Sequence, residues 1–412
     1  MINTSTKTSM KPWLIVASLF VIALLNYIDR TMITTMRESI IGSIPMSDAQ
    51  FGLLTAVFLW VYGLFSPFAG FLADKYSKSR VIIFSLFVWS LVTWMTSLAT
   101  TFNELLITRA LMGISEACYI PAALSLIMEY HTGRTRSLAT GVHMAGIMTG
   151  QSLGFLGGWI AENHTWNYAF SIFGIFGICY AIMLSFFLKD APNVEKKSEE
   201  VIEEKVQFIK TIRVLFRKRS YILIVLFFAL ISIVSWLIVG WLPTYFKEKF
   251  DLSQTQAGIY STGYVFTSAI LGVLIGGYLT DLWSKRNTKS RILVPFIGLC
   301  IAAPAIFLAS YATVIVVSLV CFIVYTFFKS FTDTNTMPIL SLVVEPKYRS
   351  TGYGFLNFCG TLVGGLGLYF GGSLRDSNID LELIFKLASI LIILAAVCLF
   401  MVKPDKDLIK ED

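Results

Sequence analysis

The residues best suited to chemistry are charged side chains set inside long apolar segments: Asp29, Arg30, Arg109, Glu116, Lys329 and Asp333. Ionisable groups at membrane depth are costly, so they usually face the protein interior and serve a function. Arginine holds a carboxylate or phosphate through a planar fork of donors. A carboxyl group shielded from water keeps its proton more readily. This set therefore suits binding of an organic anion coupled to a proton.

Arg30 is the first candidate for gripping the anion. Arg109 is either a second grip or the structural partner of Asp29 or Glu116, since Arg109 and Glu116 lie nearly two turns apart on one helix face. Glu116 and Asp29 are the candidate proton carriers. An anion that occupies the arginine would free the carboxylate to bind a proton, which couples the two ligands. The alternative is that some of these charges only join helices.

Lys329 and Asp333 are neighbours on one helix face. We expect Lys329 to contribute to substrate binding and Asp333 to proton coupling. A structural ion pair with neither role is the alternative.

Four polar or aromatic residues at similar depth are expected to line the substrate site: Tyr27, Gln151, Tyr353 and Asn357. Sugars favour aromatic stacking beside amide donors, so these residue types suit a sugar acid. Aromatic side chains that only fill space between helices are the alternative.

Composition sets the class of protein. Hydrophobic residues make up 56% of the 412 residues and charged residues 14%, whereas soluble domains carry about 25% charge. Apolar stretches long enough to span a bilayer recur along the chain, and we expect twelve: 12–35, 50–72, 81–100, 105–129, 137–161, 167–188, 221–246, 255–282, 292–309, 312–341, 350–373 and 381–402.

The net charge of +7 follows from membrane topology. With the N-terminus inside, most Lys and Arg residues fall in the tails and the even-numbered loops, and the odd-numbered loops hold only Arg37, Lys247, Lys249 and Arg375. The positive-inside rule then places both termini in the cytoplasm. Because topology accounts for the charge, a nucleic-acid partner is not expected.

One phrase occurs twice. Residues 70–78 and 277–285 both read G-x-L-x-D-x-x-S-K, each after a long apolar run. A membrane chain that repeats itself at half its length is typical of secondary transporters, whose substrate lies between the halves. The predicted fold is all-α and integral to the membrane, with twelve transmembrane helices in two pseudo-symmetric six-helix halves.

The predicted boundaries are an N-terminal half at 1–188, a cytoplasmic linker at 189–220, a C-terminal half at 221–402 and a cytoplasmic tail at 403–412. The linker mixes Glu, Lys and Arg, and it is either solvated or carries an amphipathic helix on the anionic leaflet.

The charged residues of the repeated phrase lie at the predicted cytoplasmic surface, where acids cap helix ends and pair with bases of the other half. Such bonds would lock the outward-open state, so we expect a gating role for five residues: Asp74, Lys78, Arg80, Asp281 and Lys285. Glycines at four-residue spacing in 146–158 and 360–372 predict close helix packing across the interface between the halves.

No P-loop, nucleophile elbow or zinc-protease motif occurs in the sequence. The six cysteines all fall in apolar spans without metal-ligand spacing. We therefore expect no enzyme activity, no cofactor and no metal.

These features together resemble the major facilitator superfamily, whose cytoplasmic 2–3 loop motif the repeated phrase matches. Three further phrases, N-Y-I-D-R at 26–30, R-A-L-M-G-I-S-E-A at 109–117 and W-L-P-T-Y at 241–245, resemble the anion:cation symporters of hexuronate, galactonate and sialin type. The first two phrases are also similar to spinster-like lipid carriers. The resemblance implies that the matching Asp, Arg, Arg and Glu positions bind substrate and couple protons.

The expected function is a proton-coupled symporter that imports an organic anion by alternating access, with a sugar acid or small acidic glycan fragment as cargo. A spinster-like lipid or lysolipid transporter is the first alternative, and a transport-inactive sensor on the same scaffold is the second. We expect a monomeric, multi-pass protein of the cell inner (plasma) membrane, with the substrate, protons and the lipid bilayer as its partners.

Overall fold

The structure is a computed structural model that describes residues 10–131, 135–191, 208–287 and 289–405. In these residues the regular elements are all helical. The first half contains α1 (Met10–Thr35), α2 (Arg37–Ser43), α3 (Asp48–Lys75), α4 (Lys78–Thr96), α5 (Phe102–Ala117), α6 (Tyr119–Tyr130), α7 (Arg136–Ser152), α8 (Phe155–Asn163) and α9 (Trp166–Phe187). Between the halves lies α10 (Phe208–Phe216). The second half contains α11 (Arg219–Phe250), α12 (Gln254–Gly258), the π-helix η2 (Ile259–Tyr264), α13 (Val265–Ser284), α14 (Ser290–Tyr311), α15 (Ile315–Ser341), the 3-10 turn η3 (Pro346–Tyr348), α16 (Arg349–Asp376) and α17 (Leu381–Phe400).

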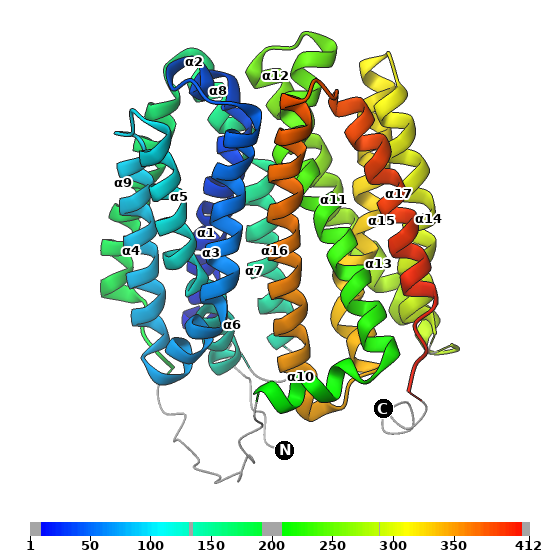
Figure 1. Cartoon of the computed structure of the whole chain (residues 1–412). Helices are drawn as coiled ribbons and strands as arrows, with labels where there is room; N and C mark the ends of the chain where they lie inside the picture. The colour runs from blue at the N-terminus through cyan, green and yellow to red at the C-terminus, as the bar shows by residue number, and fades with distance from the viewer. Residues whose placement is uncertain (1–9, 132–134, 192–207, 288, 406–412) are drawn as a thin grey trace.

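The long helices run side by side, and short helices mark the two ends of the bundle (Figure 1). The end that holds α2, α8 and α12 is called the α2 face below. The opposite end, where α10 lies and where α1 begins, is called the α10 face.

Eleven helices of the described chain are long and apolar enough to cross a membrane. The expected span at 137–161 is present as two shorter helices, because α7 ends at Ser152 and α8 begins at Phe155. Because of this break, the fifth expected span is not a single membrane-crossing helix, and eleven are found among the described residues in place of twelve. The predicted all-helical membrane fold is confirmed.

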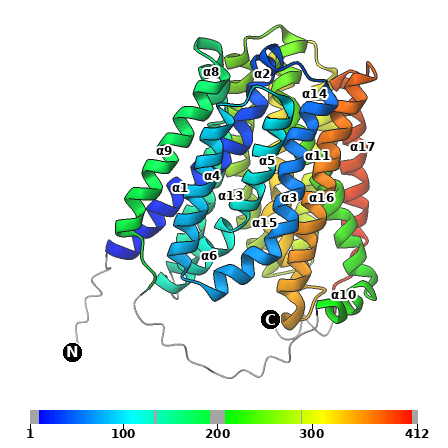
Figure 2. The ribbon, with the colours of Figure 1, turned by 60° about the vertical axis from the view of Figure 1, so that its left-hand side comes forward.

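Equivalent helices pack in the same way in both halves. In the first half α1 packs on α7, α3 on α5, and α4 on α9. In the second half α11 packs on α16, α13 on α15, and α14 on α17. These are the same pairings, six spans later, and Figure 2 shows the long helices of both halves aligned along the bundle. The internal sequence repeat therefore corresponds to a repeated structure.

The glycine prediction is only partly right. Cβ atoms added at Gly146 and Gly150 would collide with backbone atoms of α1, in the same half. In α16, Gly364 faces Trp236 of α11, also in its own half, but Gly365 faces Trp60 of α3 in the other half. The glycines thus serve packing within each half as well as between halves, since a helix carries small residues on more than one face.

The tightest junction between the halves joins α3 and α16. Near the α2 face a Cβ at Gly52 would lie 2.5 Å from the carbonyl oxygen of Leu368, and one at Gly372 would collide with the backbone of Asp48. Toward the α10 face Gly354 has nothing within 4 Å. The two helices are therefore in close contact at one end and spread apart at the other.

The predicted domain boundaries stay a prediction. α9 ends at Phe187 and α11 begins at Arg219, while residues 192–207 of the linker lie outside the described residues. α10, at the end of the linker, packs against α11 and α16, and its Phe216 ring contacts Phe355 at 5.3 Å between centroids.

Candidate functional site

Four of the predicted charged residues meet inside the first half. Asp29 and Arg30 of α1 are 4% and 5% exposed, and Arg109 and Glu116 of α5 are 1% and 0% exposed. Arg30 Nε donates to Glu116 Oε2 at 2.8 Å. The sequence left the partner of Glu116 open, and the structure pairs it with an arginine from another helix. The cluster holds two positive and two negative side chains, so its formal charge is balanced.

Aromatic rings from two helices surround the Arg30 guanidinium. Its centre lies 4.6 Å from the Tyr27 ring, 4.9 Å from Phe58 and 4.6 Å from Tyr62. Phe58 and Tyr62 stand one turn apart on α3, and sequence reasoning missed both. Cation–π attraction is stronger where water is excluded, so these rings hold the guanidinium plane in a fixed orientation.

Asp29 and Arg109 are less fully paired. Asp29 Oδ2 accepts from Thr93 of α4 at 2.9 Å, and Oδ1 has no hydrogen-bond partner in the described part of the chain. Arg109 reaches only the sulfur of Met112, at 3.4 Å, and its Nε has no partner among the described residues. Buried donors without partners are costly, so Arg109 has free capacity to bind an anion.

A small cavity connects both arginines with the second half. Arg30, Arg109 and Phe58 line one side, and Trp236 and Gly240 of α11 line the other. Its volume is about 10 Å³, room for roughly one water. A solute can enter only when the halves move apart, which is how a carrier with a central site operates.

The predicted pair in the second half is formed as well. Lys329 Nζ donates to both carboxylate oxygens of Asp333, at 2.9 and 3.0 Å, and the Asp333 side chain is 43% exposed. Tyr353 of α16, which was predicted to line the substrate site, is 39% exposed.

We expect Asp333→Asn to lower the free energy of unfolding by less than about 1 kcal/mol, because partly exposed ion pairs contribute little. Transport should fall several-fold if the carboxylate couples protons. Thermal unfolding and liposome uptake measure the two effects separately. Wild-type transport in this variant would make the pair a structural feature only.

Two other predicted residues lie on the interface helices. Gln151 follows Gly150, whose added Cβ would lie 3.0 Å from Cβ of Tyr27. Asn357 lines an apolar cavity of about 560 Å³ between α3 and α16. Leu64, Phe68 and Phe355 also line it, at the end where α3 and α16 spread apart.

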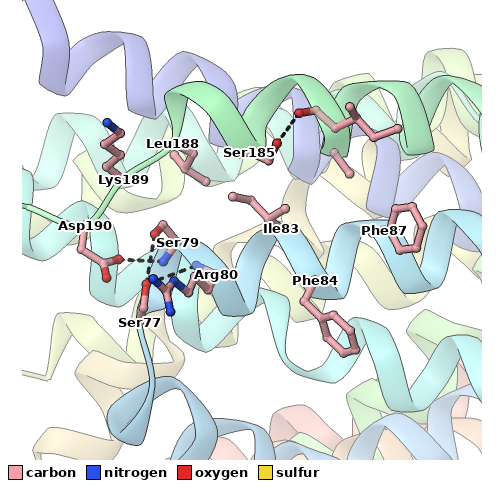
Figure 3. Close-up of a pocket in the computed structure, with 12 residues that line it drawn as sticks. Ser77, Ser79, Arg80, Ile83, Phe84, Phe87, Ser185, Leu188, Lys189 and Asp190 are labelled. Carbon is pink, nitrogen blue, oxygen red and sulfur yellow. Dashed lines mark hydrogen bonds between the residues drawn. The ribbon is translucent and has the colours of Figure 1, made fainter.

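The predicted gating residues lie at the α10 face, and their described contacts stay within their own half. Lys78 pairs with Glu129 of α6 at 2.7 Å. Arg80 borders a groove of about 650 Å³ between α4 and the end of α9, both in the first half (Figure 3). Asp281 and Lys285 are exposed, and the Asp74 side chain lies outside the described part. Their gating role remains a prediction.

Asp190 fixes the start of α4 beside that groove. Its Oδ1 accepts from the backbone N of Ser79 at 2.8 Å (Figure 3). Burial alone would raise the pKa of Asp190, but hydrogen bonds from Ser77 and Ser79 and the charge of Lys78 hold that pKa below its usual value. The carboxylate thus occupies the helix N-terminus.

Ion pairs join the halves at the α2 face instead. Arg375 of α16 pairs with Asp48 of α3 at 2.9 Å and with Glu248 of α11 at 2.7 Å. Arg37 pairs with Asp48 and Glu248, and Lys247 pairs with Glu38 at 2.9 Å. Arg37, Lys247 and Arg375 were all predicted to lie in odd-numbered loops. Lys249, the fourth basic residue of those loops, pairs with Glu382. Their acidic partners were not foreseen, because they come from distant helices.

The fold and its buried charge cluster define a membrane-embedded carrier rather than an enzyme. The chain belongs to the Major Facilitator Superfamily, whose family model matches residues 19–368 and again 233–411. The resemblance seen in the repeated phrase is confirmed.

Among individual proteins the chain is similar to spinster homologues. Protein spinster homolog 1 of Xenopus tropicalis is 28% identical over 356 residues, which cover 82% of this chain and 68% of that protein. The sphingosine-1-phosphate transporter SPNS2 of the same species is 25% identical, covering 85% of this chain and 71% of that protein.

A solved structure has the same fold. It is a bacterial homolog of the human lysosomal transporter spinster, in an inward-facing and unoccupied conformation. The TM-score is 0.82 at 22% identity, over 96% of this chain and 97% of that chain. The expected similarity to spinster-like carriers is thereby supported.

Proposed function

We propose that this transporter carries an amphipathic anion of the lysolipid type, with a phosphate or carboxylate head group and one apolar chain, together with protons. It works as a monomer in the inner membrane, with the α10 face in the cytoplasm. The cargo moves by alternating access as the halves rock around the central cluster.

The observation that carries the proposal is the apolar cavity between α3 and α16. It measures about 560 Å³ and is lined by Leu64, Phe68, Phe355 and Phe358. Leu64 and Phe68 are 57% and 64% exposed, so this cavity opens to the outside of the bundle. A sugar acid needs an enclosed polar site, whereas a lipid chain needs an apolar path into the bilayer.

The head group would bind at Arg30 and Arg109. Arg109 keeps an unpartnered Nε among the described residues, and Arg30 keeps an unpartnered Nη2. Two guanidinium groups with free donors match a phosphate, which has several acceptor oxygens. The name of the similar sphingosine-1-phosphate transporter fits a cargo of this chemistry.

Coupling would run through Glu116. The head group and Glu116 compete for the Arg30 guanidinium, so arrival of the anion releases the carboxylate. A released carboxylate in a dry site takes up a proton. The substrate and the proton therefore bind together, and Asp29, with its own free oxygen, is the second carrier.

Uptake into proteoliposomes under an imposed proton gradient tests the proposal. Lysophosphatidate, sphingosine-1-phosphate, glucuronate and sialic acid should be compared with the gradient on and off. Gradient-driven movement of the lipid phosphates supports the proposal. Movement of only the sugar acids would replace it with the sugar-acid symporter that the sequence favoured. Binding without movement of any of the four would favour the sensor.

A second test blocks the cavity. Gly354 has nothing within 4 Å and lines the cavity, so Gly354→Trp should fit without disturbing the fold. We expect it to reduce lysolipid uptake at least about tenfold, because the indole fills space that the apolar chain needs. Inorganic phosphate should still compete for the arginines in a binding assay.

Gly141→Trp is the matched control, since Gly141 of α7 also has nothing within 4 Å and does not line this cavity. Its uptake should equal that of the wild type. Equal uptake in Gly354→Trp would show that the chain follows another path.

A further inference from the structure

The helices that begin the second span of each half have the same N-terminal cap. Before α3, Ser47 Oγ accepts from the N of Gln50 at 3.3 Å, and Gln50 Oε1 accepts from the N of Ser47 at 2.9 Å. Before α12, Ser253 and Gln256 form the same two bonds, both at 3.2 Å. This capping box leaves the first two amides of each helix without intrahelical partners.

An acid from the opposite half binds both of these amides at α3 and one of them at α12. Asp376, at the end of α16, accepts from the N of Asp48 at 2.9 Å and from the N of Ala49 at 3.0 Å. Glu162, at the end of α8, accepts from the N of Thr255 at 2.8 Å and from Ser253 Oγ at 3.1 Å. A carboxylate at a helix N-terminus is favoured by the helix dipole.

A second sequence repeat supports the two caps. Residues 157–162 read G-G-W-I-A-E and residues 371–376 read G-G-S-L-R-D, so a glycine pair precedes each acid. A Cβ at Gly158 would lie 3.0 Å from the carbonyl oxygen of Gln254, and one at Gly372 would collide with the backbone of Asp48. In both halves the glycine allows the opposite helix to approach, and the acid one turn later caps it.

We infer that Glu162 and Asp376 are a symmetry-related pair of latch residues, which hold the α2 face shut by capping helices of the opposite half. Both must leave their helix N-termini before the pathway can open at that face. The caps lie where α2, α8 and α12 gather at one end of the bundle (Figure 1). Because water can reach this end, it can replace the carboxylates when the halves separate, so the latch is reversible.

Ion pairs also lie beside the caps. The pairs of Glu38 and Glu248 are less suited to this task, because these side chains are 61% and 45% exposed and exposed pairs add little to stability. The Arg375–Asp48 pair, with side chains 14% and 15% exposed, holds the halves together as well. Each cap also satisfies at least one backbone amide, which stays in place whatever the side chains do. The inference concerns a conformational step and does not depend on which cargo is carried.

Distances between spin labels across the α2 face test the latch. Labels at Gly42→Cys in α2 and Thr313→Cys before α15 report on the two halves, since both positions are exposed. The six native cysteines are first replaced. In the Glu162→Ala/Asp376→Ala double variant we expect the long-distance population to rise at least about fivefold, because the acceptor oxygens of both caps are removed.

Glu248→Gln is the matched control, because it removes ion pairs to Arg37 and Arg375 and leaves both caps. It should keep the wild-type distance distribution. Gly372→Ala should open the face with both acids present, whereas Gly141→Ala should not. If the double variant does not fold, Gly372→Ala and the single variants carry the test. An unchanged distribution in the cap variants, or an equal shift in Glu248→Gln, overturns the inference.

Discussion

Arg30→Ala should abolish transport, with a fall in uptake of at least about 100-fold. The Arg30 guanidinium is 5% exposed and pairs with Glu116 at 2.8 Å. Removing one member of a buried pair leaves the other charge uncompensated, at a cost of about 3–5 kcal/mol. The same change also removes the main group proposed to hold the anionic head. Uptake of a labelled lipid phosphate into proteoliposomes measures the loss.

Loss of folding alone could give the same result, so two further variants are needed. Arg30→Ala/Glu116→Ala removes both charges and should be more stable than Arg30→Ala, since no buried charge is left unpaired. It should still fail to transport. Arg30→Lys keeps the charge but loses the planar fork, so it should fold and bind the substrate weakly. Full transport in the double variant would remove Arg30 from the substrate site.

Glu116→Gln should separate substrate binding from proton coupling. Glutamine cannot carry the proton, so accumulation driven by a pH gradient should disappear. The guanidinium of Arg30 loses its competitor, so the substrate should bind at least about tenfold more tightly. In the wild type the affinity should rise as pH falls, because a protonated Glu116 no longer competes. In Glu116→Gln the affinity should depend less on pH than in the wild type.

Equilibrium binding between pH 5 and 8 and counterflow exchange measure these effects. Exchange without a gradient should persist, since it needs no net proton movement. Glu129→Gln serves as the control, because Glu129 lies in the same span but pairs with Lys78 near the surface. A wild-type pH dependence in Glu116→Gln would assign coupling to another group, with Asp29 the next candidate.

Several features of this protein were determined by the sequence alone. The length of the apolar runs fixes membrane-crossing helices, because no other open structure satisfies its backbone groups in lipid. The repeated phrase at 70–78 and 277–285 predicts two related halves, and the helix pairings confirm them. Asp29, Arg30, Arg109 and Glu116 could be singled out because charge inside an apolar run is costly wherever it occurs.

The tertiary structure decided which of these groups meet. Arg109 and Glu116 share one helix face, yet the hydrogen bond to Glu116 comes from Arg30 on α1. The rings of Phe58 and Tyr62 complete the site from α3. Spacing along one helix cannot predict such contacts, since they depend on how neighbouring helices cross and rotate.

The dependence on helix packing also explains why the sequence did not predict the contacts at the α2 face or the apolar cavity that favours a lipid cargo. The S-x-x-Q boxes at 47–50 and 253–256 are visible in the sequence, but the acids that complete them come from the opposite half. The apolar cavity beside Gly354 exists only because α3 and α16 touch at one end and spread at the other. Local composition therefore fixed the membrane-crossing helices and their buried charges, whereas the packing of the two halves decided the partners, the latch and the path for the substrate.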